Sequence, residues 1–270
     1  MSTDIFYFSG TGNSLCVAKQ LSAKLSDTVR IFPVRNFKDQ KKIEIDSDSL
    51  IIVFPVYFQD IPRIVKSVIK KLEFKTPSPC IFGVATCNGS PGHSLFTLKR
   101  MLNKKDKSLS AGFAITMPGN SLIVYDFTNP PEVRFQRLND SKQRLDEISG
   151  YINNKQSDYI EGSDDFKYHL RGLVTGTVAK FIYKTPAKFR TTGNCSKCMS
   201  CIRICPQNNI KMDTEGPKWG RNCEHCLACF HWCPKMAVEL GNNTIGKLRY
   251  HHPEISINDM YIEETLQRHL

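Results

Sequence analysis

Two kinds of hydrophobic pattern alternate along the first 160 residues of the chain. Short runs that are apolar throughout, such as 51–54 and 81–85, are typical of parallel strands buried on both faces. Longer segments in which apolar residues recur every three or four positions predict helices that cover such strands. This alternation favours an α/β fold built on a doubly wound parallel sheet. Strands are predicted at 4–8, 29–34, 50–54, 80–86 and 111–116, and helices at 15–25, 62–72, 93–102 and 131–153.

The loop between the first strand and the first helix is rich in hydroxyl groups and reads Ser9-Gly10-Thr11-Gly12-Asn13-Ser14. Backbone N–H groups and hydroxyls at a helix N-terminus form a ready phosphate site. The loop lacks the Gly-Lys-Ser/Thr of a P-loop, and Leu15 stands where the dinucleotide fingerprint needs its third glycine. Its composition suits a terminal phosphate monoester, and an ordinary strand-to-helix turn is the alternative interpretation.

This loop resembles the phosphate loop of the flavodoxin family, and the resemblance covers about residues 1–155. It implies a five-stranded, flavodoxin-like sheet that binds the phosphate of FMN through Ser9, Thr11, Gly12, Asn13 and Ser14. It also implies two loops that clamp the isoalloxazine ring, one with Pro55, Tyr57 and Phe58, the other with Thr86, Asn88 and Gly89. Tyr57 or Phe58 would stack on the flavin. Flavodoxins are usually acidic, whereas residues 1–160 carry 22 Lys and Arg against 15 Asp and Glu.

Three further features lie near the predicted flavin loops. Cys87 is interpreted as a small filler residue, with a catalytic thiol as the alternative. His93 is expected to open a helix and not to act as a base. The long segment 118–125 lies near the same edge of the sheet, where it is expected to cover the flavin.

Eight of the eleven cysteines form two copies of one pattern, C-x2-C-x2-C-x3-C-P, which start 28 residues apart. This run is typical of bacterial [4Fe–4S] proteins. Two structural zinc sites are the alternative, and a disulfide framework is less favoured because low-potential iron–sulfur chemistry indicates a reducing compartment. The copies are Cys195, Cys198, Cys201, Cys205 and Cys223, Cys226, Cys229, Cys233.

Residues 190–240 closely resemble two-cluster bacterial ferredoxins, in which the fourth cysteine of each run ligates the other cluster. The resemblance implies one cluster on Cys195, Cys198, Cys201 and Cys233, and another on Cys223, Cys226, Cys229 and Cys205. Short strands are expected at 210–212 and 237–240. The side chains of Trp219, Phe230 and Trp232 are expected to shield the clusters, and those of His225 and His231 to lie at the surface.

Composition and charge describe an ordinary globular chain with a basic surface. The 270 residues are 40% hydrophobic, and the formal net charge is +11. Two clusters, each with about −2, would lower this charge to roughly +7. The chain shows no nucleic-acid motif, no signal peptide and no stretch of eighteen apolar residues, so we expect a cytoplasmic protein without a membrane span. Cys16 and Cys80 are expected to be buried free thiols.

The predicted organisation has four parts. A flavodoxin-like domain covers 1–155, and a connector with an interdomain helix covers 156–189. A small α+β ferredoxin-like domain covers 190–240, and a tail, 241–270, is expected to pack back on a domain. The helix after the connector carries apolar residues on one face, which we expect to dock: Phe166, Leu170, Leu173, Val174, Val178 and Phe181.

The whole chain resembles the flavodoxin–ferredoxin fusion proteins of anaerobic prokaryotes. The resemblance implies an iron–sulfur flavoprotein that transfers electrons between two [4Fe–4S] clusters, FMN and redox partner proteins. Two other hypotheses stay open: a flavin-dependent reductase of a small substrate fed by the clusters, and a cluster protein whose flavodoxin-like domain is empty and docks a partner. No set of acid, base and nucleophile was found, and the electron donor, acceptor and oligomeric state stay open.

Overall fold

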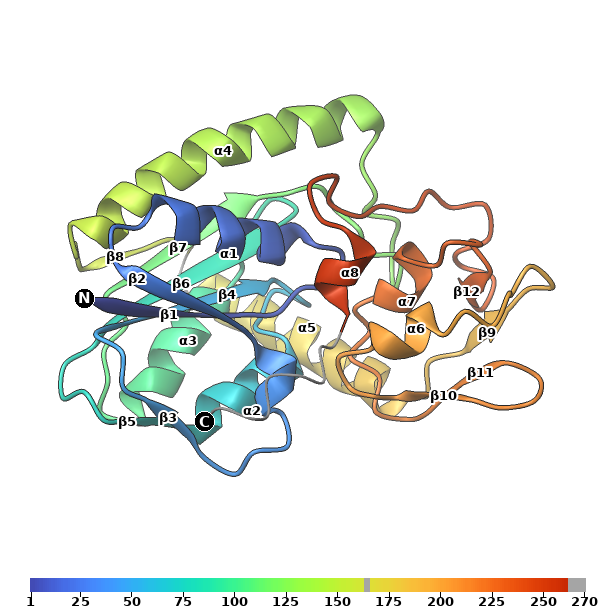
Figure 1. The fold of residues 1–270 in the computed structure, drawn as a ribbon, viewed down its shortest axis with the longest axis horizontal. Coiled ribbons are helices and arrows are strands. Elements are labelled where there is room, and N and C mark those ends of the chain that lie inside the picture. The colour runs from blue at the N-terminus through green and yellow to red at the C-terminus, as the bar shows by residue number, and fades with distance from the viewer. Residues whose placement is uncertain (163–165, 262–270) are drawn as a thin grey trace. The chain divides into compact units, whose positions relative to one another are not determined.

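The computed structural model describes residues 1–162 and 166–261, with side chains from 175 onward in the second range. Its largest element is a parallel sheet with strand order β2-β1-β4-β6-β7-β8 (Figure 1). The first five strands follow the flavodoxin-like order 2-1-3-4-5. The strands are β1 (Ser2–Tyr7), β2 (Thr28–Pro33), β4 (Ser49–Pro55), β6 (Cys80–Cys87), β7 (Ala111–Thr116) and β8 (Tyr159–Ile160).

The sheet has six strands, so the prediction of five is wrong by one. The extra strand, β8, is two residues long and pairs only with Ala111 and Gly112 of β7. Beyond that pair, the carboxylate of Glu161 accepts the N–H of Ala114 at 2.7 Å and closes part of the sheet edge. A two-residue strand in a polar segment carries no hydrophobic period, so the sequence pattern could not indicate it.

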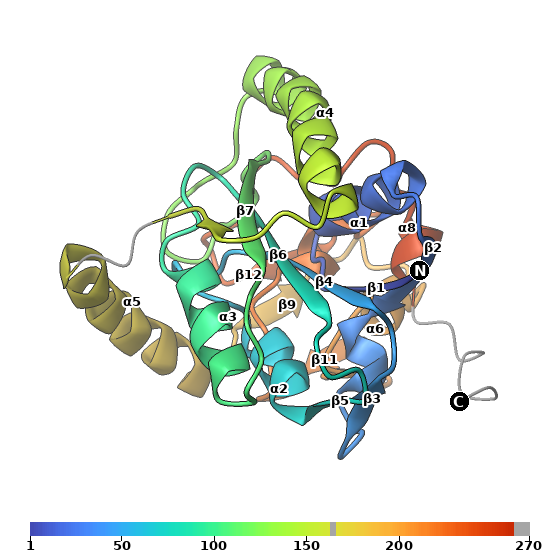
Figure 2. The same ribbon diagram turned by 90° about the vertical axis from the view of Figure 1, so that its left-hand side faces the viewer.

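Helices cover both faces of the sheet. Figure 2 shows α1 and α4 on one face and α2 and α3 on the other. Each turns an apolar stripe inward; in α2, for example, Ile64, Val65, Val68 and Ile69 are buried. The helices are α1 (Asn13–Lys24), α2 (Arg63–Lys71), α3 (Ser94–Asn103) and α4 (Pro131–Asn153), and a 3-10 helix, η1 (Val34–Phe37), follows β2. Two further strands, β3 (Ile43–Ile45) and β5 (Leu72–Phe74), form a separate two-stranded parallel sheet that the sequence did not indicate.

The described chain separates into two compact units that are not continuous in sequence. The first contains 1–9, 13–119 and the described part of 129–181, and therefore the whole parallel sheet. The second contains 10–12, 120–128 and 182–261. Helix α5 (Phe166–Lys184) spans the division. Of its predicted docking face, Val178 and Phe181 are exposed, and the side chains of Phe166, Leu170, Leu173 and Val174 lie outside those described.

The second unit consists of very short elements that repeat every 28 positions. In this repeat, α6 (Ser200–Arg203) corresponds to α7 (Ala228–His231), and β10 (Ile210–Met212) corresponds to β12 (Val238–Leu240). The repeat extends to the backbone, because three pairs of non-glycine residues 28 positions apart share a positive φ: Lys197 and His225, Met199 and Leu227, Asn208 and Met236. Strand β10 pairs with β11 (Pro217–Trp219), β12 pairs with β9 (Phe189–Thr191), and α8 (Ile257–Met260) follows.

The core of the second unit includes residues from a distant loop. Leu122, only 4% exposed, packs in one cluster with Ile210, Leu227, Phe230 and Leu240, and Ile123 lies against it. Two apolar residues of the segment 118–125, which is expected to cover the flavin, therefore pack in the cysteine-bearing unit. Val124 and Tyr125 of the same segment are exposed. Among the helices that the structure describes, none has the length and apolar character of a bilayer-spanning helix.

We expect Leu122→Ala to destabilise the second unit by about 2–5 kcal/mol, because it removes a buried side chain from a small core. Val124→Ala is the matched control in the same loop, since half of the Val124 side chain is exposed and its change should stay within about 0.5 kcal/mol. Urea unfolding followed by Trp fluorescence reports this unit, because both tryptophans lie in it. Equal effects of the two changes would contradict the proposed role of Leu122.

Candidate functional site

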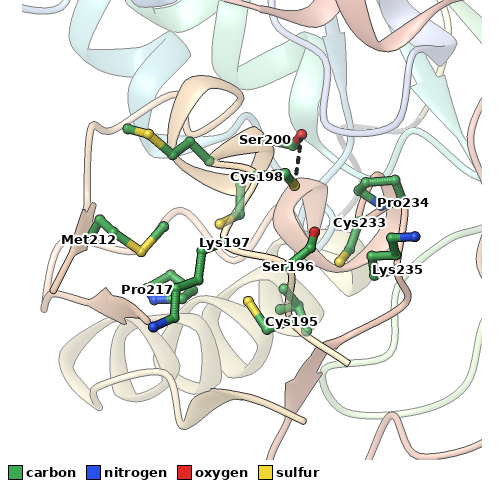
Figure 3. Close-up of a pocket in the computed structure, with 13 residues that line it drawn as sticks. Cys195, Ser196, Lys197, Cys198, Ser200, Met212, Pro217, Cys233, Pro234 and Lys235 are labelled. Atoms are coloured by element: carbon green, nitrogen blue, oxygen red, sulfur yellow. Dashed lines mark hydrogen bonds between the residues drawn. The ribbon is translucent and has the colours of Figure 1, made fainter. Parts of the chain in front are cut away.

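The eight cysteines of the repeat gather in two places in the second unit. Cys195, Cys198, Cys201 and Cys233 line one small cavity, to which the first run contributes three residues and the second run its last. Figure 3 shows Cys195, Cys198 and Cys233 around this cavity. The thiol of Cys198 donates a hydrogen bond to Ser200 Oγ at 3.4 Å, and Lys197 and Lys235 also line the cavity. This is the set that the sequence predicts for the first cluster.

The second group consists of Cys205, Cys223, Cys226 and Cys229, and it is indicated by the groups that influence the pKa of Cys226 and Cys229. Burial raises the pKa of Cys226 and Cys229 well above its usual value, and negative charge on Cys223 and Cys205 raises it further. In the first group, burial raises the pKa of Cys201 to about 11, and Cys233, Cys198 and Cys195 add to this effect. The cysteines that act on each of these three thiols are therefore members of the same predicted cluster set. Ligation of iron itself stays a prediction.

Backbone N–H groups point at sulfur in an equivalent way in both runs. The N–H of Asn209 donates to Cys205 Sγ at 3.4 Å, and the N–H of Ala237 donates to Cys233 Sγ at 3.2 Å. Both donors lie four residues after their cysteine, at the same place in the repeat. Hydrogen bonds to ligand sulfur are one of the means by which a protein sets the potential of an iron–sulfur cluster.

The surroundings of the cysteines suit an iron–sulfur cofactor in a further respect. Trp219 Nε1 is buried beside the sulfur of Cys229, and hydrogen bonding from the Trp219 side chain offsets part of the effect of burial on the pKa of this thiol. No three His, Cys, Asp or Glu side chains of the described chain converge in a way that would hold one metal ion. A cubane needs another arrangement, because each of its four thiolates caps a different iron.

The expectation that His225 and His231 lie at the surface is wrong, because both are buried. His225 packs edge-on against Tyr183, with ring centroids 5.6 Å apart. His231 Nε2 lies 2.8 Å from the carbonyl oxygen of Asn120, and its Nδ1 accepts the N–H of Tyr250 at 3.1 Å. Phe230 and Trp232, which are expected to shield the clusters, are buried, and Trp219 is half-buried. The shielding itself stays a prediction.

The predicted phosphate loop connects β1 to the first turn of α1. Thr11, Asn13 and Ser14 are all buried, and no acidic residue stands in the first turn of the helix. Ser14 and Thr86 share one hydrogen bond of 2.8 Å between their hydroxyls, so the hydroxyl that accepts keeps a proton to donate. Gly12 has a φ of +96°, which L side chains rarely adopt, and Ser9 is half-buried. The loop thus offers hydroxyls and helix N–H groups without a competing carboxylate.

The two predicted flavin loops lie in the first unit, next to each other at the carboxyl ends of β4 and β6. Pro55 ends β4, and the N–H of Val56 donates to the carbonyl of Thr86 at 2.9 Å. Tyr57 and Phe58 are half-buried, and the Tyr57 ring meets Phe8 edge-on at 6.0 Å. A Cβ added to Gly89 would meet no atom within 4 Å, so this glycine faces open space.

Residues 57–60 form a tight turn that backbone hydrogen bonds close, and the Asp60 carboxylate in this turn lies next to Lys66 and His93. The backbone groups of Tyr57 and Asp60 bond to each other twice at 2.9 Å. Burial acts to raise the pKa of Asp60, but hydrogen bonding to His93 and the charge of Lys66 outweigh it and hold this pKa at about 2. His93 stands just before α3, as predicted, and its contact with Asp60 links the two flavin loops.

Two residues at this edge were missed by sequence reasoning. Arg137 of α4 donates through Nη1 to Asn88 Oδ1, to Asn129 Oδ1 at 2.9 Å and to the Met117 carbonyl at 3.3 Å. Nothing in the sequence around Arg137 signals this role. Gly92, with a φ of +55°, lets the second loop approach Gln59, and the Pro91-Gly92 pair could have indicated that turn.

The other cysteines have ordinary surroundings. Burial raises the pKa of Cys87, which therefore stays protonated, as suits a filler residue better than a nucleophile. Cys16 is buried as expected, whereas Cys80 is half-buried at the start of β6.

Comparison with known proteins finds likeness in part of the chain only. No protein-family model matches the chain, and no curated protein matches it. An NADH:FMN oxidoreductase, EMOB, in its apo form matches at 13% identity and a TM-score of 0.41, over 62% of this chain and 92% of its own. A flavodoxin of Streptococcus pneumonia TIGR4 matches at 13% identity and 0.37, over 57% and 99%. An azoreductase of Bacillus anthracis str. Sterne matches at 10% identity and 0.38, over 57% and 100%.

We expect Cys205→Ala to damage selectively the cluster assigned to Cys223, Cys226 and Cys229, although Cys205 belongs to the other run. Iron per chain and the EPR spectrum of the reduced protein measure the loss. Cys80→Ala is the matched control, because Cys80 belongs to neither group. Selective loss of the cluster on Cys195, Cys198 and Cys201 would show that the fourth ligands are not crossed.

Proposed function

We propose that this protein is an iron–sulfur flavoprotein that transfers electrons between two [4Fe–4S] clusters, FMN and a redox partner protein. Each cluster passes one electron at a time, whereas FMN accepts or donates one or two. Together the cofactors would convert between one-electron and two-electron transfer. The chain's own contribution would be to hold the three centres, exclude water from them and tune their potentials.

The grouping of the cysteines is the observation that carries this proposal. Two runs have the spacing of bacterial [4Fe–4S] proteins, and Cys233 of the second run lines one cavity with Cys195, Cys198 and Cys201 of the first, which supports the crossed ligand sets. Cys198 is exposed, whereas Cys229 is buried. We therefore propose that the cluster on Cys195, Cys198, Cys201 and Cys233 exchanges electrons with the partner protein.

The FMN part of the proposal is supported by the phosphate loop and the strand order of the sheet. Ligands of open α/β sheets bind beyond the carboxyl ends of the strands, where the Ser9–Ser14 loop and both flavin loops begin. A phosphate near Thr11 and Ser14 would meet hydroxyl donors and the positive end of α1, with no acidic residue in its first turn. Tyr57, Phe58, Asn88 and Gly89 are the residues proposed to hold the flavin ring.

Electron transfer is proposed ahead of the reductase alternative because the described loops hold no nucleophile paired with a base. Cys87 is a buried, protonated thiol, and His93 is bound to Asp60. Anaerobic purification followed by counts of iron, sulfide, zinc and flavin tests the proposal. We expect about eight iron and eight sulfide per chain, and one FMN, from two cubanes and one flavin site. Zinc without sulfide, or clusters without flavin binding, would overturn it.

We expect the double change Thr11→Ala and Ser14→Ala to weaken FMN binding by about tenfold or more for each donor lost, because each hydroxyl would bond to a charged phosphate. Riboflavin has no phosphate, so its affinity should hardly change. Ser22→Ala, eight residues further along α1, is the matched control. Flavin fluorescence titrations measure both dissociation constants. Equal weakening for FMN and riboflavin would place the phosphate elsewhere.

A further inference from the structure

The middle of the phosphate loop, residues 10–12, belongs to the second unit and is held there through two backbone carbonyls. Trp232 Nε1 donates to the carbonyl of Gly10 at 3.0 Å, and the backbone N–H of His252 donates to the carbonyl of Thr11 at 2.8 Å. In a trans peptide the C=O of one residue and the N–H of the next point in opposite directions. Fixing these two carbonyls therefore directs the N–H groups of Thr11 and Gly12 away from Trp232 and His252.

The same unit also sets the Thr11 hydroxyl. Asn120 Nδ2 donates to Thr11 Oγ1, which leaves the hydroxyl proton of Thr11 to be donated elsewhere. The position of Asn120 is fixed in turn by buried His231. Because His231 Nδ1 accepts the N–H of Tyr250, Nε2 carries the proton and donates to the Asn120 carbonyl at 2.8 Å. The chain of contacts thus leads from the second cysteine run to a hydroxyl of the phosphate loop.

The packing around this contact is tight. A Cβ added to Gly12 would lie 3.1 Å from the Cβ atoms of both His252 and Ile255, so the loop backbone rests directly on this segment. Trp232 is buried and stacks on His251, with centroids 4.3 Å apart and an interplanar angle of 17°. It lies in the chain between Cys229 and Cys233, which belong to the two different cysteine groups.

We propose that the cluster-bearing segment completes the phosphate-binding loop, so that FMN and the iron–sulfur clusters are bound cooperatively. Trp232 and Asn120 are positioning residues in this proposal: they orient the donors of the loop and need not touch the phosphate. The inference rests on the proposed function, since it concerns the same FMN site. It adds a coupling between the cofactors, which must act equally in both directions.

The first test compares FMN with riboflavin in cluster-loaded protein. Trp232→Phe keeps an aromatic ring and loses one neutral hydrogen bond, so FMN should bind about two- to tenfold more weakly, with riboflavin almost unchanged. Tyr125→Phe is the matched control, because it also keeps an aromatic ring, and the Tyr125 side chain is exposed and meets Phe127 edge-on. Asn120→Asp replaces the donor with an acceptor and should weaken FMN binding more. Iron content shows whether each variant keeps its clusters.

The second test uses the unchanged protein and measures the coupling from the other side. At matched flavin saturation, FMN should slow the loss of iron to a chelator more than riboflavin does, because only FMN engages the loop that Trp232 holds. In Trp232→Phe this difference between the two flavins should disappear. A purely structural role of Trp232 would change both rates alike.

The outcomes separate this inference from the proposed function. If the unchanged protein does not bind FMN, the proposed function fails, and the inference fails with it. If it binds FMN, but Trp232→Phe weakens FMN and riboflavin equally or not at all, the inference alone is overturned. Equal protection of iron by FMN and riboflavin would also overturn the inference, whatever the variants do.

Discussion

If the proposed clusters are bound, the convergence of eight cysteine thiols is the constraint on which the second unit depends. Its helices α6 and α7 are four residues long, and its strands have three residues each. Such elements bury little apolar surface, and six residues of the repeat adopt left-handed backbone conformations that cost of order 1 kcal/mol or more each. Strain of this kind persists only where the surroundings over-determine it. Thiolate–iron bonds at eight points would do so, because metal binding then contributes directly to folding.

The second unit also obtains stability from parts of the chain far away in sequence. Leu122 and Ile123 enter its core, and the loop that carries them is anchored in the first unit by the bond from Gly119 N–H to Asn129 Oδ1. Asn129 is itself held by Arg137, which also bonds to Asn88 in a predicted flavin loop. These hydrogen bonds fix Gly119 and Asn129, the two residues that flank the segment 120–128, which carries Leu122 and Ile123 and belongs to the second unit.

The sequence predicts well what local patterns control. Apolar runs located the five long strands, and the bounds of β7 and α4 agree to the residue. The cysteine spacing and the phosphate loop were recognisable because each motif lies within a few consecutive residues. Strand β8 was missed because two residues show no period. The burial of His231 and the contact of Trp232 with Gly10 were missed because their partners lie more than a hundred positions away and leave no trace in the local pattern.

The discontinuity of the second unit has a consequence for how the chain matures. During synthesis the N-terminal part emerges first and can form its sheet while the ribosome is still translating the cysteine runs. Leu122 would then leave the ribosome before Ile210, Phe230 and Leu240, the neighbours that cover it, have been made. For that interval a nascent chain would present an apolar loop tip to chaperones and to other chains. The long sequence separation of these contacts should make closure of the second unit the slow step of folding.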